Sequence, residues 1–291
     1  MTEQEFLKTY NIEKYDRPSV ATDIVTFSVM QDEVTNNRKL PEEKLKVLLI
    51  KRASHPCMNM WALPGGFCRK DEDIMATAKR ELKEETGVDD AYLSVIGIEG
   101  DVDRDKRGWI ISHSFMALIN GKEYEVRGGT DAWEAKWFEV SLEKKEIFKK
   151  VNGNKARIEN EYELKLIGEG EILCANILEI KDFSGFHEQI SYEIKENTGI
   201  AFDHAKIMLK ALLVLRNNVK DYGFMAFDML PECFTLAQLQ KVYEIIGGEK
   251  LTTPNFRRKM LPYLVDTKET YEDRWTRPAV LYKRNVEEFY K

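Results

Sequence analysis

The first half of the chain alternates between short apolar runs and polar, turn-rich segments. Residues 21–30 (ATDIVTFSVM) and 45–51 (LKVLLIK) are rich in β-branched and other apolar residues, which is typical of strands. The segment between them predicts a loop, because it combines Asn, Pro and many charged residues. Further strands are expected at residues 92–98, 109–120 and 135–140. This part of the chain is therefore predicted to form a sheet.

A glycine-containing loop and one helix interrupt these strands. Residues 61–68 (WALPGGFC) contain a Pro-Gly-Gly turn, and residues 71–86 predict a helix whose apolar face includes Leu82. Gly87 follows this helix at a position where glycine favours helix termination. A loop and then a helix are thus expected between two strands of the sheet.

The middle of the chain changes in character after residue 140. Residues 144–155 are strongly basic, and the later stretch EYELKLIGEGEILCANILEI carries β-type residues that Gly168 and Gly170 interrupt. Residues 141–197 are therefore predicted to be a strand-rich insertion in the first domain, or an extension of it.

The last third of the chain returns to helical patterns. Residues 202–219 (FDHAKIMLKALLVLRNNV) predict an amphipathic helix that ends the first domain or bridges to the next. His204 lies in this helix, where a structural hydrogen bond is the expected role of a lone histidine. Thr235 favours the start of another helix, and a further helix is expected near residues 254–264.

A β segment follows these helices. Residues 276–284 (TRPAVLYKR) come after a polar loop and are rich in residues that favour strands. Helix, turn, helix and β ribbon together indicate a winged helix-turn-helix. Two domains are therefore predicted, residues 1–220 and residues 221–291.

The composition is that of a soluble globular protein. Hydrophobic residues make up 43% of the 291 residues, and the formal net charge is −6. This charge argues against broad binding of nucleic acid or membrane surfaces by the whole molecule, but not against a local basic patch. No apolar run is long enough to span a membrane, and no leader pattern opens the sequence. The four cysteines lack metal-ligand spacing, so a reducing, cytoplasmic setting is expected.

Three glutamates on the first predicted helix are candidate metal ligands. Glu81, Glu84 and Glu85 follow one another at i, i+3 and i+4, so they lie on one face. Carboxylates this close repel each other unless a cation lies among them. Mg²⁺ is often held by a few carboxylates together with substrate phosphates, so the pattern predicts a metal platform for phosphate chemistry.

The residues around these glutamates resemble the Nudix box, G-x5-E-x7-R-E-U-x-E-E-x-G-U with U apolar. Gly66, Glu72 and the run from Arg80 to Val88 match every defined position. The resemblance implies a fold of the α+β class, in which a Nudix α/β/α sandwich precedes the winged helix-turn-helix domain. It also implies hydrolysis of a nucleoside diphosphate linked to another group.

The resemblance further assigns roles within the box. Glu81, Glu84 and Glu85 would bind Mg²⁺ or Mn²⁺ and belong to the catalytic residues. Glu72 and Arg80 would form an ion pair that ties the loop to the helix, or Glu72 would support the geometry alone. Gly66 would offer its backbone to the metal or turn sharply where a side chain would clash.

Other site residues are expected outside the box. Nudix proteins often recruit another carboxylate, and Glu134 is the candidate, either as metal ligand or as general base. The alternative is a solvated loop carboxylate, and Asp131 is a weaker candidate for the same role. Arg104 and Arg107, in a charged loop between strands, and Arg52, at a strand end, are candidates for binding phosphate or ribose. A charged hairpin tip can also simply be solvated.

Longer phrases narrow the subfamily. RPSVATDIV, WALPGGF and DVDRDKRGW in the first domain are similar to Nudix-related transcriptional regulators of NAD-type cofactor metabolism, as are FDHAKIMLKAL, FTLAQLQKVYE, NFRRKML and TRPAVLY in the second. Several Nudix hydrolases share the same C-terminal domain. The resemblance implies ADP-ribose or a related compound as the ligand. A homodimer is expected, because palindromic operators need paired winged helices.

Two functions follow from these resemblances. The leading prediction is a Mg²⁺-dependent pyrophosphohydrolase acting on ADP-ribose or a related nucleotide, because the Nudix box is intact whereas regulators often have an eroded one. The alternative is a transcriptional regulator that senses ADP-ribose or an NAD-related metabolite and binds DNA. Its DNA contacts would come from the second helix of the winged domain and from the wing. These candidates are Arg257, Arg258, Lys259 and Arg277, with Lys283 and Arg284 beside them.

Overall fold

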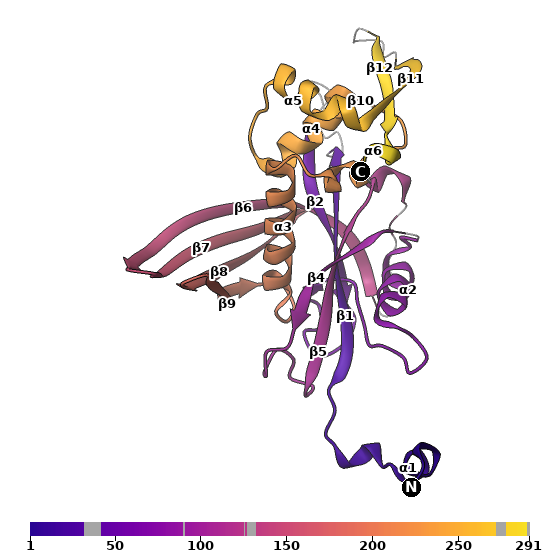
Figure 1. Ribbon diagram of the computed structural model, residues 1–291, viewed down its shortest axis with the longest axis vertical. Helices are drawn as coiled ribbons and strands as arrows, with labels where there is room; N and C mark the ends of the chain where they lie inside the picture. Colours follow the sequence, from indigo (N-terminus) through magenta and orange to yellow (C-terminus); the bar gives the residue numbers. More distant parts are fainter. Residues whose placement is uncertain (32–41, 90, 125, 127–131, 272–277, 290–291) are drawn as a thin grey trace.

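The computed structural model describes residues 1–31, 42–89, 91–124, 126, 132–271 and 278–289. Figure 1 shows a central sheet with a helix on each side, and a long sheet extension that leaves the body. A small C-terminal domain lies at one end of the central sheet, and an N-terminal arm leaves at the other end.

The central sheet has the strand order β4-β5-β1-β2-β6, and β1 pairs in parallel with β5 and antiparallel with β2. Its strands are β1 (Ser19–Gln31), β2 (Glu43–Arg52), β3 (Trp61–Ala62), β4 (Leu93–Glu99), β5 (Ile110–Leu118) and β6 (Ala132–Asn152), and β3 pairs with β2. Residues 21–29 of β1 are all buried, because a helix covers each face of the sheet. A strand is present at each place where the apolar runs predicted one.

Helix α2 (Ile74–Thr86) covers one face of the central sheet. The Asp73 carboxylate accepts a hydrogen bond from the N–H of Ala76 at 2.7 Å, so the helix begins after this cap and not at residue 71. The helix ends at Gly87, whose φ of 78° is the left-handed conformation that glycine adopts readily. Leu82 is buried in the apolar cluster between the helix and the sheet.

Helix α3 (His204–Lys220) lies on the opposite face of the sheet (Figure 1). Its apolar positions Ile207, Leu212 and Leu215 are fully buried in the larger of the apolar clusters. A 17-residue helix is about 25 Å long, so α3 spans most of one side of the central sheet. It ends at the residue where the sequence predicted the boundary between the two domains.

No helix in the described ranges is both long and apolar enough to cross a membrane.

The strand-rich segment predicted at residues 141–197 continues the central sheet. β6 runs out of the body and is followed by β7 (Lys155–Gly168), β8 (Glu171–Ser184) and β9 (His187–Thr198), each antiparallel to the strand before it. We call residues 141–198 the sheet extension. The N-terminal arm, residues 1–18, contains α1 (Glu3–Thr9) and the 3-10 turn η1 (Ile12–Lys14).

The C-terminal domain has the predicted helices followed by a ribbon. Its elements are the 3-10 segment η3 (Phe224–Met229), β10 (Phe234–Thr235), α4 (Leu236–Gly247), α5 (Thr253–Met260), the 3-10 turn η4 (Leu261–Tyr263), β11 (Leu264–Tyr271), β12 (Ala279–Arg284) and α6 (Val286–Phe289). The strands form a sheet of order β10-β12-β11. Thr235 caps α4 in a capping box with Gln238.

Two details of this domain differ from the sequence predictions. The helix expected to reach residue 264 ends at Met260, because Pro262 lacks the N–H that would continue it. The polar loop expected before the β segment is in part the strand β11, whose residues are polar because most of them are exposed. The mixed α/β fold with a C-terminal winged helix is otherwise confirmed.

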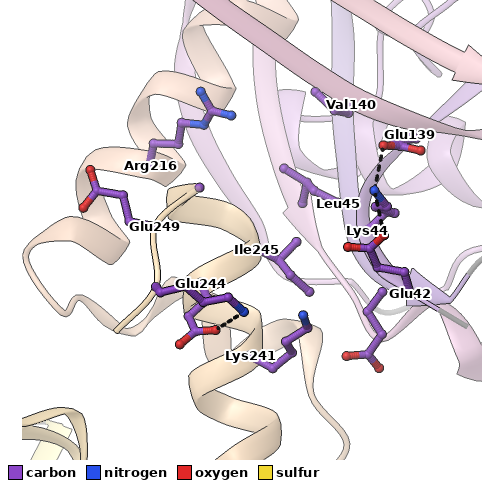
Figure 2. A pocket seen from close by; sticks show the side chains of 13 residues that line it. Glu42, Lys44, Leu45, Glu139, Val140, Arg216, Lys241, Glu244, Ile245 and Glu249 are labelled. Atoms are coloured by element: carbon purple, nitrogen blue, oxygen red, sulfur yellow. Dashed lines mark hydrogen bonds and ion pairs between the residues drawn. The ribbon is translucent and has the colours of Figure 1, made fainter. Parts of the chain in front are cut away.

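The two domains meet where α4 packs beside the start of β2 and against α3. A groove of about 260 Å³ lies at this junction, and Figure 2 shows the side chains that line it. Lys44 lies 3.3 Å from Glu42 and 3.5 Å from Glu139, so its charge is compensated within the first domain. Leu45 and Ile245 belong to one apolar cluster, which continues from the sheet into the winged domain. The junction is therefore a packed contact with a small polar rim.

Candidate functional site

A cavity of about 500 Å³ opens at the end of the sheet far from the winged domain. Six segments contribute to it: the start of β1, the end of β2, the loop after β3, α2, the loop between β4 and β5, and the residues before α3. It brings together Arg52, Gly66, Glu81, Glu85, Arg104 and Arg107, all named as candidates from the sequence. The cavity therefore is the candidate ligand site.

The glycine turn approaches α2 more closely than any other residue type allows. A Cβ atom on Gly66 would lie 2.5 Å from the carboxyl carbon of Glu81. A Cβ atom on Gly65 would lie 2.0 Å from the carbonyl oxygen of Thr22. The N–H of Thr22 in turn donates to the carbonyl of Gly66 at 2.9 Å. The two glycines are required because backbone and carboxylates meet here without intervening side chains.

Arg80 organises the acidic face of α2. Its Nε and Nη2 atoms lie 2.6 and 2.9 Å from the two carboxylate oxygens of Glu72, which is a bidentate ion pair. Its Nη1 atom lies 2.7 Å from Glu81 and 3.1 Å from Glu84. The hydrogen bond from Arg80 lowers the pKa of Glu72 to about 2. The spacing of the box therefore places one guanidinium among three carboxylates, which relieves their repulsion.

The three predicted metal ligands do not share one environment. Glu81 and Glu85 line the cavity, and Glu85 accepts a hydrogen bond from the N–H of Gly65 at 2.8 Å. Glu84 is 47% exposed and faces Arg80 and Arg69. In the described part of the chain, no group of three or more His, Cys, Asp or Glu is arranged to hold a metal ion. Glu81 and Glu85 do fit a Mg²⁺ ion that shares its coordination with ligand phosphates.

Two arginines and an aromatic ring form one wall of the cavity. The guanidinium carbons of Arg52 and Arg107 lie 4.9 and 5.5 Å from the centre of the Phe202 ring. Arg107 also lies 5.0 Å from the ring of Phe67. Burial lowers the pKa of Arg52, and the nearby charge of Arg107 lowers it further. Two cations held this close favour an anionic ligand between or beside them.

The sequence patterns did not identify Phe202 as a site residue. Its φ of 51° is left-handed, a conformation that residues other than glycine rarely adopt. Its only sequence signal was its place at the start of the helix predicted at residues 202–219. The backbone turn instead directs this ring into the cavity.

Arg104 lines the same cavity but is committed to two aspartates. Its Nε and Nη2 atoms donate to Asp203 at 3.1 and 2.8 Å, and Nη2 also donates to Asp23 at 3.0 Å. His204 accepts a hydrogen bond from the N–H of Leu63 through Nδ1 at 2.9 Å, so its Nε2 carries the proton that faces Asp23 at 3.3 Å. The expected structural hydrogen bond of His204 is therefore present. Arg104 therefore lines the cavity with its guanidinium paired to two aspartates.

The groups around Asp23 control its protonation. Burial alone raises the pKa of this carboxyl, but His204, Arg104 and the Ser112 hydroxyl together lower it well below its usual range. Asp23 therefore stays ionised and fixes the start of α3 to β1.

Glu134 is placed away from the cavity. It is exposed on β6 and pairs in register with Lys51, whereas Ile50 and Arg52 line the cavity. Successive side chains of a strand point to opposite faces, so the face of Glu134 and Lys51 is turned from the site. This position argues against the expected role of Glu134 as metal ligand or general base. Asp131 lies outside the described residues.

The candidate DNA-contacting residues lie mainly on α5. Arg257, Arg258 and Lys259 are exposed, and Lys259 lies 3.8 Å from the centre of the Tyr222 ring. Arg277 lies outside the described residues. Lys283 pairs with Glu232, while Arg284 bonds to Asp228 at 2.6 Å and to the carbonyl of Phe227. The exposed basic surface is therefore α5, whereas the described wing residues are engaged within the domain.

Comparison with known families matches both halves of the chain. Residues 35–156 match the Nudix domain, and residues 226–283 match the NrtR DNA-binding winged helix domain. The sequence is 28% identical to the ADPR responsive transcriptional repressor NtrR of Acinetobacter baylyi, over 99% of this chain and 90% of that protein. It is 40% identical to the ADP-ribose pyrophosphatase of Methanocaldococcus jannaschii, over 34% of this chain and 58% of that enzyme.

A solved structure has a similar arrangement over nearly its whole length. The crystal structure of a MutT/nudix family protein from Enterococcus faecalis is 26% identical and has a TM-score of 0.66. The match covers 98% of this chain and 94% of that one. Together with the two family matches, this confirms the predicted combination of a Nudix domain and an NrtR-type winged helix domain.

Proposed function

We propose that this chain, in which a Nudix domain is joined to an NrtR-type winged helix domain, is a DNA-binding regulator that responds to ADP-ribose or a related nucleoside diphosphate. The observation that carries the proposal is the path of α3. The residues at its start line the cation-rich cavity, and the residues after its end pack against the helix that bears the exposed arginines. One rigid element thus links the candidate ligand site to the candidate DNA-binding surface.

The contacts at the far end of α3 support this link. Tyr222, directly after the helix, has ring contacts of 6.2 Å with Phe256 and 6.5 Å with Tyr243. Tyr243 donates a hydrogen bond to the carbonyl of Gly223 at 2.6 Å. A ligand that shifts Phe202 or the start of α3 would therefore change the setting of α5.

The similarity to a repressor along the whole chain favours the regulator over the hydrolase that the intact Nudix box led us to expect. The acidic net charge of the protein makes nonspecific DNA binding weak, so binding would depend on α5. Arg257 and Arg258 extend from one exposed turn of α5, where they would contact phosphates or base edges.

The test is selection of duplexes from a random DNA pool on the full-length protein, followed by titration of the best duplex with ADP-ribose. Enrichment of one sequence and its release by ADP-ribose are expected. Arg257→Ala combined with Arg258→Ala should weaken binding and lower the salt slope by about 2, since each lost phosphate contact removes roughly 0.9. Absence of any enriched duplex would falsify the proposal, and release that ADP-ribose fails to produce would remove the effector from it.

Hydrolysis of ADP-ribose is the second candidate function. Its support is that Glu81 and Glu85 line the same cavity as Arg52 and Arg107. A Mg²⁺ or Mn²⁺ ion held by the two glutamates would stabilise charge on a pyrophosphate, and the arginines would bind its oxygens.

Hydrolysis is tested by measuring AMP release from ADP-ribose, NAD⁺ and nucleotide sugars with Mg²⁺ or Mn²⁺. If the second function is correct, turnover of ADP-ribose should fall at least a hundredfold in Glu85→Gln. Glu134→Gln is the matched control, because its carboxylate lies off the cavity, and it should keep wild-type turnover. Binding of ADP-ribose without turnover in the wild type would leave the Nudix domain a sensor.

A further inference from the structure

The loop between β4 and β5, residues 100–109, carries Arg107 to the wall of the cavity with little packing of its own. Its apolar side chains Val102 and Trp109 are 84% and 54% exposed. Two backbone hydrogen bonds lie within the loop, and both are long, at 3.2 and 3.4 Å. A segment with few buried contacts opens easily. Contacts outside the loop are therefore needed to fix the position of Arg107.

Three loop residues, spaced three positions apart, each contact one residue at the start of α3. In loop order the pairs are Asp101 with Lys206, Arg104 with Asp203, and Arg107 with Phe202. The partners follow in the reverse order along the chain, so the loop runs in the opposite direction beside the start of α3. The first two pairs are ion pairs of 2.5 and 2.8 Å, and the third is the contact between a guanidinium and a ring. The contact that places Arg107 is thus the last of a row that Lys206 begins.

Lys206 is a buried cation that does not line the cavity. Its side chain is 7% exposed and lies 3.5 Å from Glu99 and 3.4 Å from Asp203, in addition to its bond with Asp101. Burial lowers the pKa of this ammonium group, but the three carboxylates raise it more, so Lys206 stays charged. A charge is costly to bury unless opposite charges surround it. Lys206 therefore joins the base of the loop to the helix.

The residue that precedes α3 also bonds to the loop. Asp203 occupies the position where an aspartate ordinarily caps a helix, but its carboxylate accepts no capping hydrogen bond from the described residues. It accepts a hydrogen bond from Arg104 instead and lies between that cation and Lys206. One turn further along α3, Lys210 lies 2.9 and 2.8 Å from the two carboxylate oxygens of Glu99, directly before the loop. The charged residues at the start of α3 are thus directed at the loop.

We propose that Lys206 is a positioning residue for the ligand site, which holds the loop against α3 so that Arg107 faces the cavity. Its effect passes through Asp101 and the loop backbone. Because Lys206 belongs to α3, the loop and the start of the helix form one unit, and a ligand that contacts Arg107 acts on the helix as well. The inference rests on the proposed function, since it takes a nucleoside diphosphate as the ligand of the cavity.

The first test needs no ligand and measures amide hydrogen exchange of residues 100–109 in the full-length protein. Asp101→Asn removes a carboxylate that is 73% exposed and leaves Lys206 its contacts with Glu99 and Asp203, so the fold should survive. The loop amides should exchange about three- to tenfold faster in this variant, because the loop loses a charged hydrogen bond.

Lys220→Met is the matched control for this exchange experiment. Lys220 is exposed in the last turn of the same helix, far from the loop. The variant should keep the wild-type exchange of residues 100–109. Loop exchange that stays unchanged in Asp101→Asn would overturn the inference, whichever ligand the cavity binds.

The second test is a thermodynamic cycle on ADP-ribose binding, measured by isothermal titration calorimetry. Lys206→Met should weaken binding about three- to tenfold, which is less than the effect of removing Arg107 itself. In an Arg107→Ala background the same substitution should have no further effect, because the residue through which Lys206 acts is gone. A role in stability alone would lower the free energy of unfolding and leave the affinity unchanged.

The outcomes separate this inference from the proposed function. If Lys206→Met binds like the wild type, or weakens binding by the same factor with and without Arg107, the inference is wrong although the proposed function stands. A wild type that does not bind ADP-ribose would contradict the proposed effector, and the exchange experiment would still decide whether Lys206 holds the loop. If Lys206→Met does not fold, Asp101→Asn takes its place in the cycle.

Discussion

Arg104 and Arg107 lie three residues apart in one loop and line one cavity, but their surroundings differ. The Arg104 side chain is 5% exposed and bonds to two aspartates from β1 and the start of α3. The Arg107 side chain is 41% exposed, pairs with its neighbour Asp105 and faces the rings of Phe67 and Phe202. The Arg104 guanidinium is bonded to residues of the fold, whereas the partly exposed Arg107 guanidinium retains donors that a ligand can reach. Burial and partners, rather than residue type, therefore distinguish the two cations, and we propose that Arg107 is the one that binds a ligand.

The largest expected effect is on stability at the buried pair. Arg104→Ala would leave Asp23 and Asp203 buried without their shared cation, which ordinarily costs about 3–5 kcal/mol. Urea unfolding, monitored by circular dichroism, measures the loss in the free energy of unfolding. Arg107→Ala is the matched control and should cost less than about 1 kcal/mol, because its ion pair is partly exposed. Equal losses in the two variants would erase the distinction between the two arginines.

The reverse ranking is expected for ligand binding. Arg107→Ala should weaken ADP-ribose binding roughly 10- to 100-fold, since a hydrogen bond to a charged group contributes about 1.5–3 kcal/mol. Isothermal titration calorimetry on the full-length protein checks this value. Lys106→Ala serves as the control, because that neighbouring lysine does not line the cavity. Unchanged affinity in Arg107→Ala would move the anion site to another part of the wall.

The sequence predicted the backbone elements that form this site better than the contacts that its side chains make. The box residues Gly66, Glu72, Glu81 and Arg80 meet in space because fixed spacing on one helix and one turn leaves little freedom. The start and end of α2 were predictable within three residues, since Asp73 and Gly87 are strong local signals. Local patterns are reliable where the structure is determined locally.

The surroundings of several side chains in and near the site depend on tertiary contacts, which the sequence does not reveal. Arg104 and Arg107 read alike in a charged loop, and only the approach of Asp203, about a hundred positions away, makes one of them structural. Glu134 was a candidate by composition, and only the strand register shows that it lies on the face opposite to Ile50 and Arg52. Phe202 is only the first residue of a predicted helix in the sequence, and its left-handed backbone appears only in the folded chain.

A third ion pair, between Glu72 and Arg80, makes the stability of the fold depend on pH. The pKa of Glu72 falls from 4.5 to about 2 because of its hydrogen bond from Arg80. A carboxyl whose pKa is lower in the folded state stabilises the fold above pH 4.5, and this contribution is lost as the pH falls towards 2. Urea unfolding between pH 7 and 2.5 should therefore show a shallower acid loss in Glu72→Gln than in the wild type. Parallel curves would show that the pair contributes nothing to acid stability.

The smallest effect is expected at the ring between the two open arginines. Phe202→Leu keeps apolar bulk and faces the same backbone strain, but it removes the ring that Arg52 and Arg107 share. Each such contact contributes about 0.5–1 kcal/mol at an accessible site, so ADP-ribose affinity should fall roughly 5- to 30-fold if both arginines lose their placement. Phe202→Tyr keeps the ring and should bind like the wild type in the same calorimetric experiment. The Pro56 carbonyl accepts a hydrogen bond from Arg52 Nε at 2.8 Å, and Asp105 pairs with Arg107. Leucine that binds as well as tyrosine would mean that these two contacts alone hold the arginines, and that the ring only fills space.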